Sequence, residues 1–180
     1  MKLLVRLLVA VVVAVGLAGP VGPAAAASTG AAASGDPPFS ALVFSKTAAF
    51  RHASIPAGVA AIQQLGAQHN FTVDATEDAA AFTDANLARY DVVIWLSTTG
   101  DVLNDEQQAA FERYIRAGGG YAGIHAASDT EYDWAWYGGL VGAYFRDHPG
   151  SVNPQFQVAT VKVLGRGTAA IRPLPRRWVR

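Results

Sequence analysis

His125 is the first candidate for chemistry in this sequence, because it stands alone in a run of small residues, 118–130. Small residues on both sides of one reactive side chain are what the tight strand-to-helix turn of a nucleophile elbow requires. A hydrolase carries serine or cysteine at that point, so acyl-enzyme chemistry of the elbow type is not expected. Histidine can instead act as a general acid or base, because imidazole titrates near neutral pH, or it can bind a metal ion. The alternative is a histidine with structural contacts only.

A second polar segment, residues 45–54, contains two cations, an imidazole and three hydroxyl groups. A nearby helix N-terminus would add hydrogen-bond donors, so the segment suits a polar or anionic ligand. It lacks the Gly-x-x-x-x-Gly-Lys pattern of a phosphate-binding P-loop. The alternative is a solvated turn in which His52 caps a helix. We take His52 as a candidate catalytic partner of His125, and the candidate substrate-binding residues of this segment are Ser45, Lys46, Thr47 and Arg51.

The segment 129–137 interleaves three carboxylates with four aromatic side chains. Aromatic faces beside carboxylates suit sugar rings, since the C–H faces stack on the aromatic ring and the hydroxyls donate to the acids. We take Asp129 as a third catalytic candidate, and a paired-carboxylate glycosidase stays open. The alternative is a helix start with Asp129 or Asp133 as N-cap and the aromatics in the core. Further substrate-binding candidates, here and in the polar segment 97–101, are Thr99, Asp101, Asp133, Trp134 and Tyr137.

A divalent metal ion is a further hypothesis for the histidines. His52, His125 and His148, with Asp129, have the side-chain types that bind such ions. Their spacing matches no compact metal motif such as His-Glu-x-x-His. The sequence therefore names the three histidines as metal candidates and assigns no cofactor.

The polar segments follow elements that can bring them together. Apolar and alternating runs predict strands, and helical spacing with start and stop signals predicts helices. The expected strands cover residues 41–44, 71–76, 91–96, 121–124 and 156–163, and the expected helices begin at Pro56, Asp84 and Asn104. This alternation predicts an α/β fold with a mostly parallel sheet and helices on both faces. Because ligands bind at the carboxyl ends of such strands, the segments 45–54, 97–101 and 125–133 should converge.

The first 27 residues have the pattern of a secretory signal peptide. Lys2 and Arg6 precede an apolar run from Leu7 to Ala18, and small residues follow up to Ala27. The run is too short to span a bilayer of about 30 Å, so we expect export with no membrane anchor after removal of the signal. A buried N-terminal helix is the alternative. Residues 28–38 have the composition of a flexible linker.

The rest of the chain is defined by its missing cysteines and its uneven charge. The 180 residues include no cysteine, which excludes disulfides and every thiol mechanism. Residues 36–161 contain six basic and all 14 acidic side chains, a net charge of −8. Residues 162–180 contain six basic side chains and no acidic one. This basic end has no helical period, so we expect an irregular tail over 164–180 and no nucleic-acid partner.

Four stretches together resemble the ThuA-like, or trehalose-utilisation, domain. They are residues 43–52 with Ile55-Pro56, 97–101, 119–127, and Asp133-Trp134 with Tyr137-Gly138. The resemblance covers roughly residues 39–163. It implies a flavodoxin-like three-layer sandwich of the class I glutamine amidotransferase type, in which His125 stands in the place of the amidotransferase cysteine. Thiol amidotransferase activity is therefore not expected.

The same resemblance implies a role in sugar or glycoside metabolism. The expected partner is a small sugar or glycoside, such as a trehalose-type disaccharide or an oxidised derivative. His125 would be the general acid or base, with Trp134 and Tyr137 as a stacking wall. The family pattern continues past Arg180, and residues 164–172 depart from it, so the resemblance implies a domain that is incomplete at its C-terminus. A non-catalytic carbohydrate-binding module and an inactive remnant are the alternatives.

Overall fold

The computed structural model describes residues 37–148, 157–165 and 167–179. The expected signal peptide and all but the last two residues of the expected linker lie outside these ranges. The chain divides into two compact units, one of residues 30–147 and one that includes residues 148–180. No helix within the described ranges is long and apolar enough to cross a membrane.

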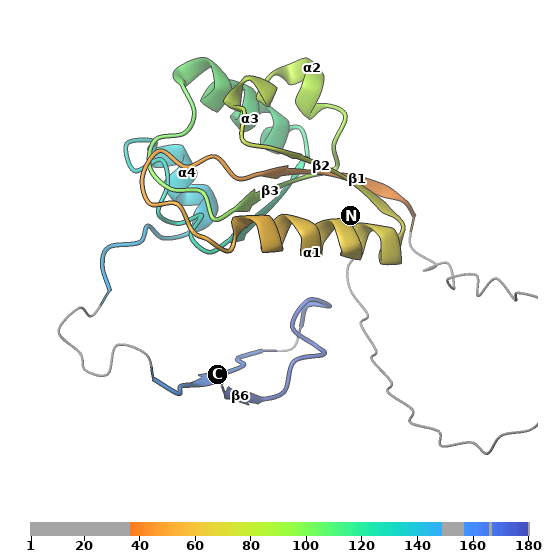
Figure 1. Ribbon diagram of the computed structural model, residues 1–180, viewed down its shortest axis with the longest axis vertical. Helices are drawn as coiled ribbons and strands as arrows, with labels where there is room; N and C mark the ends of the chain where they lie inside the picture. Colours follow the sequence, from red (N-terminus) through yellow and green to blue (C-terminus); the bar gives the residue numbers. More distant parts are fainter. Residues whose placement is uncertain (1–36, 149–156, 166, 180) are drawn as a thin grey trace, which may run out of the picture. The chain divides into compact units, whose positions relative to one another are not determined.

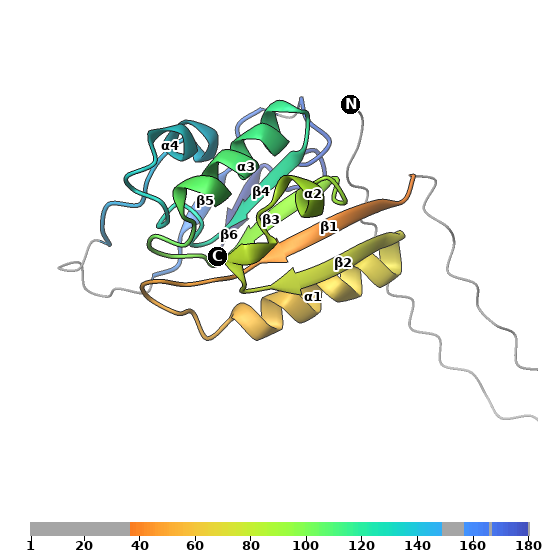
Figure 2. The same ribbon diagram turned by 90° about the horizontal axis from the view of Figure 1, so that it is seen from above.

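The first unit is built on a parallel sheet of four strands (Figures 1 and 2). The strands are β1 (Phe39–Phe44), β2 (Phe71–Thr76), β3 (Val92–Leu96) and β4 (Gly120–Ile124), in the order β2-β1-β3-β4. Strand β1 is central, and its residues 41–44 are buried, as their unbroken apolar run predicts. The chain moves outward in opposite directions from β1 and β3, so the carboxyl ends of these two strands flank the topological switch point.

Helices cover both faces of this sheet, which confirms the predicted α/β sandwich. They are α1 (Ile55–His69), the 3₁₀ helix η1 (Ala79–Ala81), α2 (Asp84–Leu87), α3 (Asp105–Arg116) and α4 (Ala135–Val141). Helix α1 packs on one face, where Ile62 meets Val43 and Leu96 (Figure 1). Helices α2 and α3 lie on the opposite face, and Phe111 and Tyr137 join its larger apolar core. The fold is consistent with a flavodoxin-like three-layer arrangement.

The beginnings of α3 and α4 differ in how well the sequence predicts them. Asn104 forms the predicted capping box, since it accepts from Gln107 N at 3.0 Å and its own N–H donates to Gln107 Oε1 at 2.9 Å. The alternative considered for segment 129–137 holds only in part, because Tyr137 lies in the core but no aspartate caps α4. Trp134 takes the N-cap position and makes no side-chain capping hydrogen bond.

The second unit contains a small antiparallel pair, β5 (Thr160–Lys162) and β6 (Arg177–Val179). The expected strand over 156–163 is thus observed for three residues, in a sheet separate from the parallel one. Its side chains are exposed, so the alternating pattern there reflects local strand propensity without burial. The segment 164–180, which we expected to be irregular, includes β6.

Candidate functional site

The three polar loops converge at the carboxyl ends of the strands, as predicted. Ala48 N donates to Thr99 O at 2.8 Å, which joins the loop after β1 to the loop after β3. Gly100 N donates to Asp129 O at 2.8 Å and Gly100 O accepts from Glu131 N at 3.1 Å, which joins the loop after β3 to the loop after β4. Gly100 has φ +75°, a conformation that favours glycine, so a glycine suits the position that makes both of these backbone hydrogen bonds.

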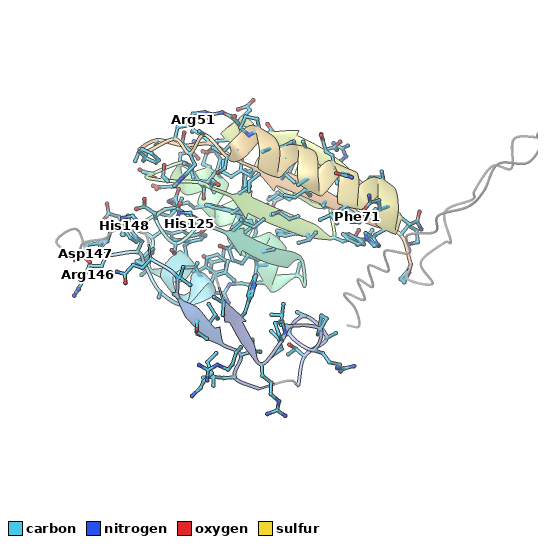
Figure 3. The ribbon with its side chains drawn as sticks, turned by 60° about the horizontal axis from the view of Figure 1, so that its bottom comes forward. Arg51, Phe71, His125, Arg146, Asp147 and His148 are labelled. Atoms are coloured by element: carbon cyan, nitrogen blue, oxygen red, sulfur yellow. The ribbon has the colours of Figure 1, made fainter. Side chains whose placement is uncertain are left out.

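Two of the predicted histidines lie side by side. The ring centroids of His52 and His125 are 4.9 Å apart with an interplanar angle of 68°, and Phe50 packs on His52 at 4.9 Å. Phe50 is 67% exposed and His125 is exposed, so solvent reaches this cluster. Ser97 Oγ donates to the His125 carbonyl at 2.7 Å and fixes the backbone there. Figure 3 shows His125 at the end of the sheet opposite to Phe71, the first residue of β2.

A cavity of about 820 Å³ lies beside these loops. Three predicted substrate-binding residues, Asp101, Asp133 and Trp134, line it. The described residues of its lining include no lysine or arginine, and its carboxylates are Asp101, Asp105, Glu106, Glu131 and Asp133. We call this space the carboxylate cavity. It presents many hydrogen-bond acceptors together with the apolar surface of Trp134.

The two cations predicted to bind a substrate are engaged within the protein. Lys46 Nζ donates to Val102 O at 2.8 Å. Arg51 donates to both carboxylate oxygens of Glu77, at 2.8 and 2.7 Å. The hydrogen bond from Arg51 lowers the pKa of Glu77 and raises the pKa of Arg51 itself. Both cations therefore connect loops within the protein, and their role in substrate binding stays a prediction.

Several predicted substrate-binding side chains are buried or bound by neighbours, which differs from the prediction. Thr99 is fully buried and its hydroxyl donates to Phe50 O at 2.7 Å. Ser45 is buried, and Thr47 pairs with Thr99 through a β-bridge. Tyr137 is fully buried in the core, where its hydroxyl donates to the carbonyl of residue 127 at 2.8 Å and burial raises its pKa well above the usual range. These residues shape the loops, and Tyr137 has no face open to a sugar.

Asp129 lies in the turn that follows His125. Its N–H donates to Ala126 O at 2.7 Å, and its carboxylate accepts from the Tyr132 hydroxyl at 2.5 Å. Burial, with the hydrogen bond to Asp129, raises the pKa of Tyr132 to about 12, so this hydroxyl stays protonated at neutral pH. The catalytic assignment of Asp129 stays a prediction, and the structure shows its carboxylate held by Tyr132.

Sequence reasoning missed Glu131 as a functional residue. Its side chain is 2% exposed, and its Oε1 accepts from the N–H groups of Val102 and Leu103, both at 2.8 Å. Its Oε2 accepts from Gln108 Nε2 at 2.7 Å. Burial raises the pKa of Glu131, although these three donors act in the opposite direction. The sequence pattern marks three acids in this segment but cannot show which one is buried.

The raised pKa of Glu131 predicts a pH dependence of stability. The unfolded chain loses this proton first, near pH 4.5, so the free energy of unfolding falls as the pH rises from there to the folded pKa. The nearby Asp101 carboxylate also raises the pKa of Glu131. Glu131→Gln should show a smaller fall across this window in denaturant unfolding measured between about pH 4 and pH 8. Identical profiles for the variant and the wild type would contradict the assignment.

The described residues contain no group of three or more His, Cys, Asp or Glu side chains that could hold a metal ion. His52 and His125 form a pair within the first unit, and His148 belongs to the second unit. The metal site at these three histidines therefore stays a prediction.

Comparisons with known proteins agree with this fold. A family model described as ThuA, trehalose utilisation, matches residues 40–180, which includes the segment that departs from the pattern expected from the sequence. A ThuA-like protein from Bacteroides uniformis is 23% identical, with a TM-score of 0.62 over 78% of this chain and 57% of that one. A ThuA-like protein from Parabacteroides merdae is 18% identical, with a TM-score of 0.56 over 79% and 60%. The chain thus spans under two thirds of both solved structures. The curated proteins give no match.

Proposed function

The chain belongs to the ThuA family of trehalose utilisation, and from that membership we propose that it binds a small, uncharged sugar or glycoside in the carboxylate cavity. The ligand class is a trehalose-type disaccharide or an oxidised derivative that carries no charge. The signal-peptide pattern of residues 1–27 supports action outside the cytoplasm. The observation that carries the proposal is a cavity that combines Trp134 with Asp101 and Asp133.

The chemistry of the carboxylate cavity suits sugar hydroxyls. Each ionised carboxylate offers acceptors to O–H groups, and such charge-assisted hydrogen bonds are stronger than neutral ones. Trp134, which is half-buried, supplies apolar surface for the C–H groups of a ring. The volume of about 820 Å³ falls in the range of small-molecule sites. Four exposed acids line the cavity, namely Asp101, Asp105, Glu106 and Asp133. A sugar acid or sugar phosphate would therefore meet like charges, and no lysine or arginine stands among the described lining residues to pair with it.

We further propose that His125 transfers a proton during turnover of the sugar, with His52 as its neighbour. The exposed imidazole of His125 stands in the loop after β4, and the His52 ring contacts it from the loop after β1. General acid or base catalysis of this kind contributes about 10²- to 10⁴-fold to a rate.

Trp134→Ala should weaken trehalose binding by about two- to tenfold, the value of one aromatic contact. Trp136→Ala is the matched control, because Trp136 stacks on Trp134 at 5.0 Å and packs on the same core but does not line the carboxylate cavity among the described residues. Calorimetric titration of both variants measures the difference. Equal losses in the two variants would contradict a ligand contact at Trp134.

A non-catalytic carbohydrate-binding module is the second candidate function. One observation favours it: neither His52 nor His125 is among the described residues that line the carboxylate cavity. A ligand in that cavity could therefore bind without reaching the imidazoles. A turnover assay run beside the titration separates the two functions, since saturable binding without product identifies the module.

A further inference from the structure

Lys46 and Glu131 hold one peptide unit from its two ends. The carbonyl of the Val102–Leu103 peptide accepts from Lys46 Nζ at 2.8 Å, and its N–H, on Leu103, donates to Glu131 Oε1 at 2.8 Å. The preceding N–H, on Val102, donates to the same Glu131 oxygen at 2.8 Å. A cation thus binds the acceptor and an anion binds the donors. We call this arrangement the Lys46–Glu131 clamp.

The clamp acts on the segment that contributes Asp101 to the carboxylate cavity. Asp101 comes directly before Val102, and the residue before it, Gly100, is bonded on both its N–H and its carbonyl. Residues 101, 103 and 104 line the cavity of about 820 Å³ together with Glu131. They also line a second cavity of about 510 Å³ together with Lys46. The segment is therefore bound on each side by a charged residue from a different cavity.

The hydrogen bonds of the clamp are stronger than bonds between neutral side chains and the backbone would be, because Lys46 and Glu131 are ionisable. A buried carboxylate is favourable only when donors satisfy its oxygens, and Glu131 has three donors, the third from Gln108 at 2.7 Å. A hydrogen bond with an ionised partner is about twice as strong as a neutral one. Lys46 and Glu131 come from the loops after β1 and β4, so the clamp transmits the position of both loops to the loop after β3.

We propose that Lys46 and Glu131 are positioning residues that fix Asp101 in the carboxylate cavity and so set the affinity of the protein for its sugar. This proposal rests on the proposed function for its affinity readout. Its structural part is the protection of the Val102 and Leu103 amides from solvent exchange, which can be measured without a ligand.

Lys46→Met tests the cationic side, because methionine keeps much of the apolar stem and removes the donor. Trehalose affinity should fall by about tenfold, and the Val102 and Leu103 amides should exchange with solvent about tenfold faster, while unfolding stays cooperative. Lys46→Arg keeps a cation and should retain most of the protection. Lys162→Met is the matched control, since Lys162 lies in the second unit and should leave both values unchanged.

An exchange of residues tests the anionic side. In Glu131→Gln with Gln108→Glu, the amide oxygen can still accept from both backbone N–H groups, and the amide N–H can donate to the new carboxylate. This double variant should keep the affinity within about threefold, whereas Glu131→Ala should lose about tenfold or more. An equal loss in the two variants would overturn the assignment of Glu131.

The two proposals fail in different ways. A folded wild type that binds no sugar contradicts the proposed function. The rate of hydrogen exchange at the Val102 and Leu103 amides then still tests the clamp. Unchanged amide protection in Lys46→Met, with unchanged affinity, overturns the positioning role whatever the ligand is.

Discussion

His125→Ala is expected to lower turnover by about a hundredfold or more, while sugar affinity stays within about threefold. The side chain is exposed, so its loss creates no buried cavity, and the His125 carbonyl keeps its bond from Ser97. Removal of the imidazole eliminates the proton transfer and leaves the carboxylate cavity intact. Product formation under saturating sugar, measured beside calorimetric binding, separates the two quantities.

His69→Ala is the matched control for that experiment. His69 is the last residue of α1, and it comes two residues before Phe71, which lies at the opposite end of the sheet from His125 (Figure 3). Turnover of this variant should equal that of the wild type. If His125→Ala kept full turnover, the general acid or base would have to be another group.

Trp95→Ala is expected to have the largest effect on stability, a loss of about 3–5 kcal/mol in the free energy of unfolding. Trp95 is fully buried in β3 and packs on Phe44 and Phe111, both at 5.4 Å, and on Tyr137 at 4.8 Å. Alanine leaves a cavity between the sheet and the helices that cover this face. Denaturant unfolding at neutral pH measures the loss.

Trp95→Phe shows whether Trp95 stabilises the fold through ring packing or through hydrogen bonding. The described part of the chain offers Trp95 Nε1 no hydrogen-bond partner, although this atom is buried. Phenylalanine removes that unsatisfied donor and keeps most of the ring contacts, so it should cost less than half as much as alanine. A phenylalanine variant as unstable as the alanine variant would contradict this account of the core.

The elements of the first unit follow from local patterns, which is why the sequence predicts them well. The unbroken apolar runs of β1 and β3 are typical of strands that are covered on both faces of a sheet. Asn104 and Gln107, three residues apart, form a capping box that marks the start of α3. The convergence of the loops also follows, because parallel strands place all their carboxyl ends at one edge. Short β5 has no such burial, and there the pattern predicted a longer strand than the structure has.

The partners of charged side chains are the part that local patterns could not predict. Lys46 donates to a carbonyl 56 positions away and Arg51 donates to an acid 26 positions away, and no local pattern in the sequence indicates either partner. Glu131 and Asp133 are two residues apart, yet one is buried and the other is exposed, because the backbone turns at Glu131. Tyr137 has the residue type of a sugar-binding wall, and only its burial shows a structural role.

The most direct test of the account is calorimetric titration of the wild-type protein with trehalose and with trehalose phosphate. The carboxylate cavity predicts saturable binding of the uncharged sugar and no detectable binding of the anion, because the four exposed acids of its lining repel the added negative charge. Absence of binding by trehalose and other uncharged glycosides to the folded protein, or tighter binding of the phosphate, would contradict the central claim.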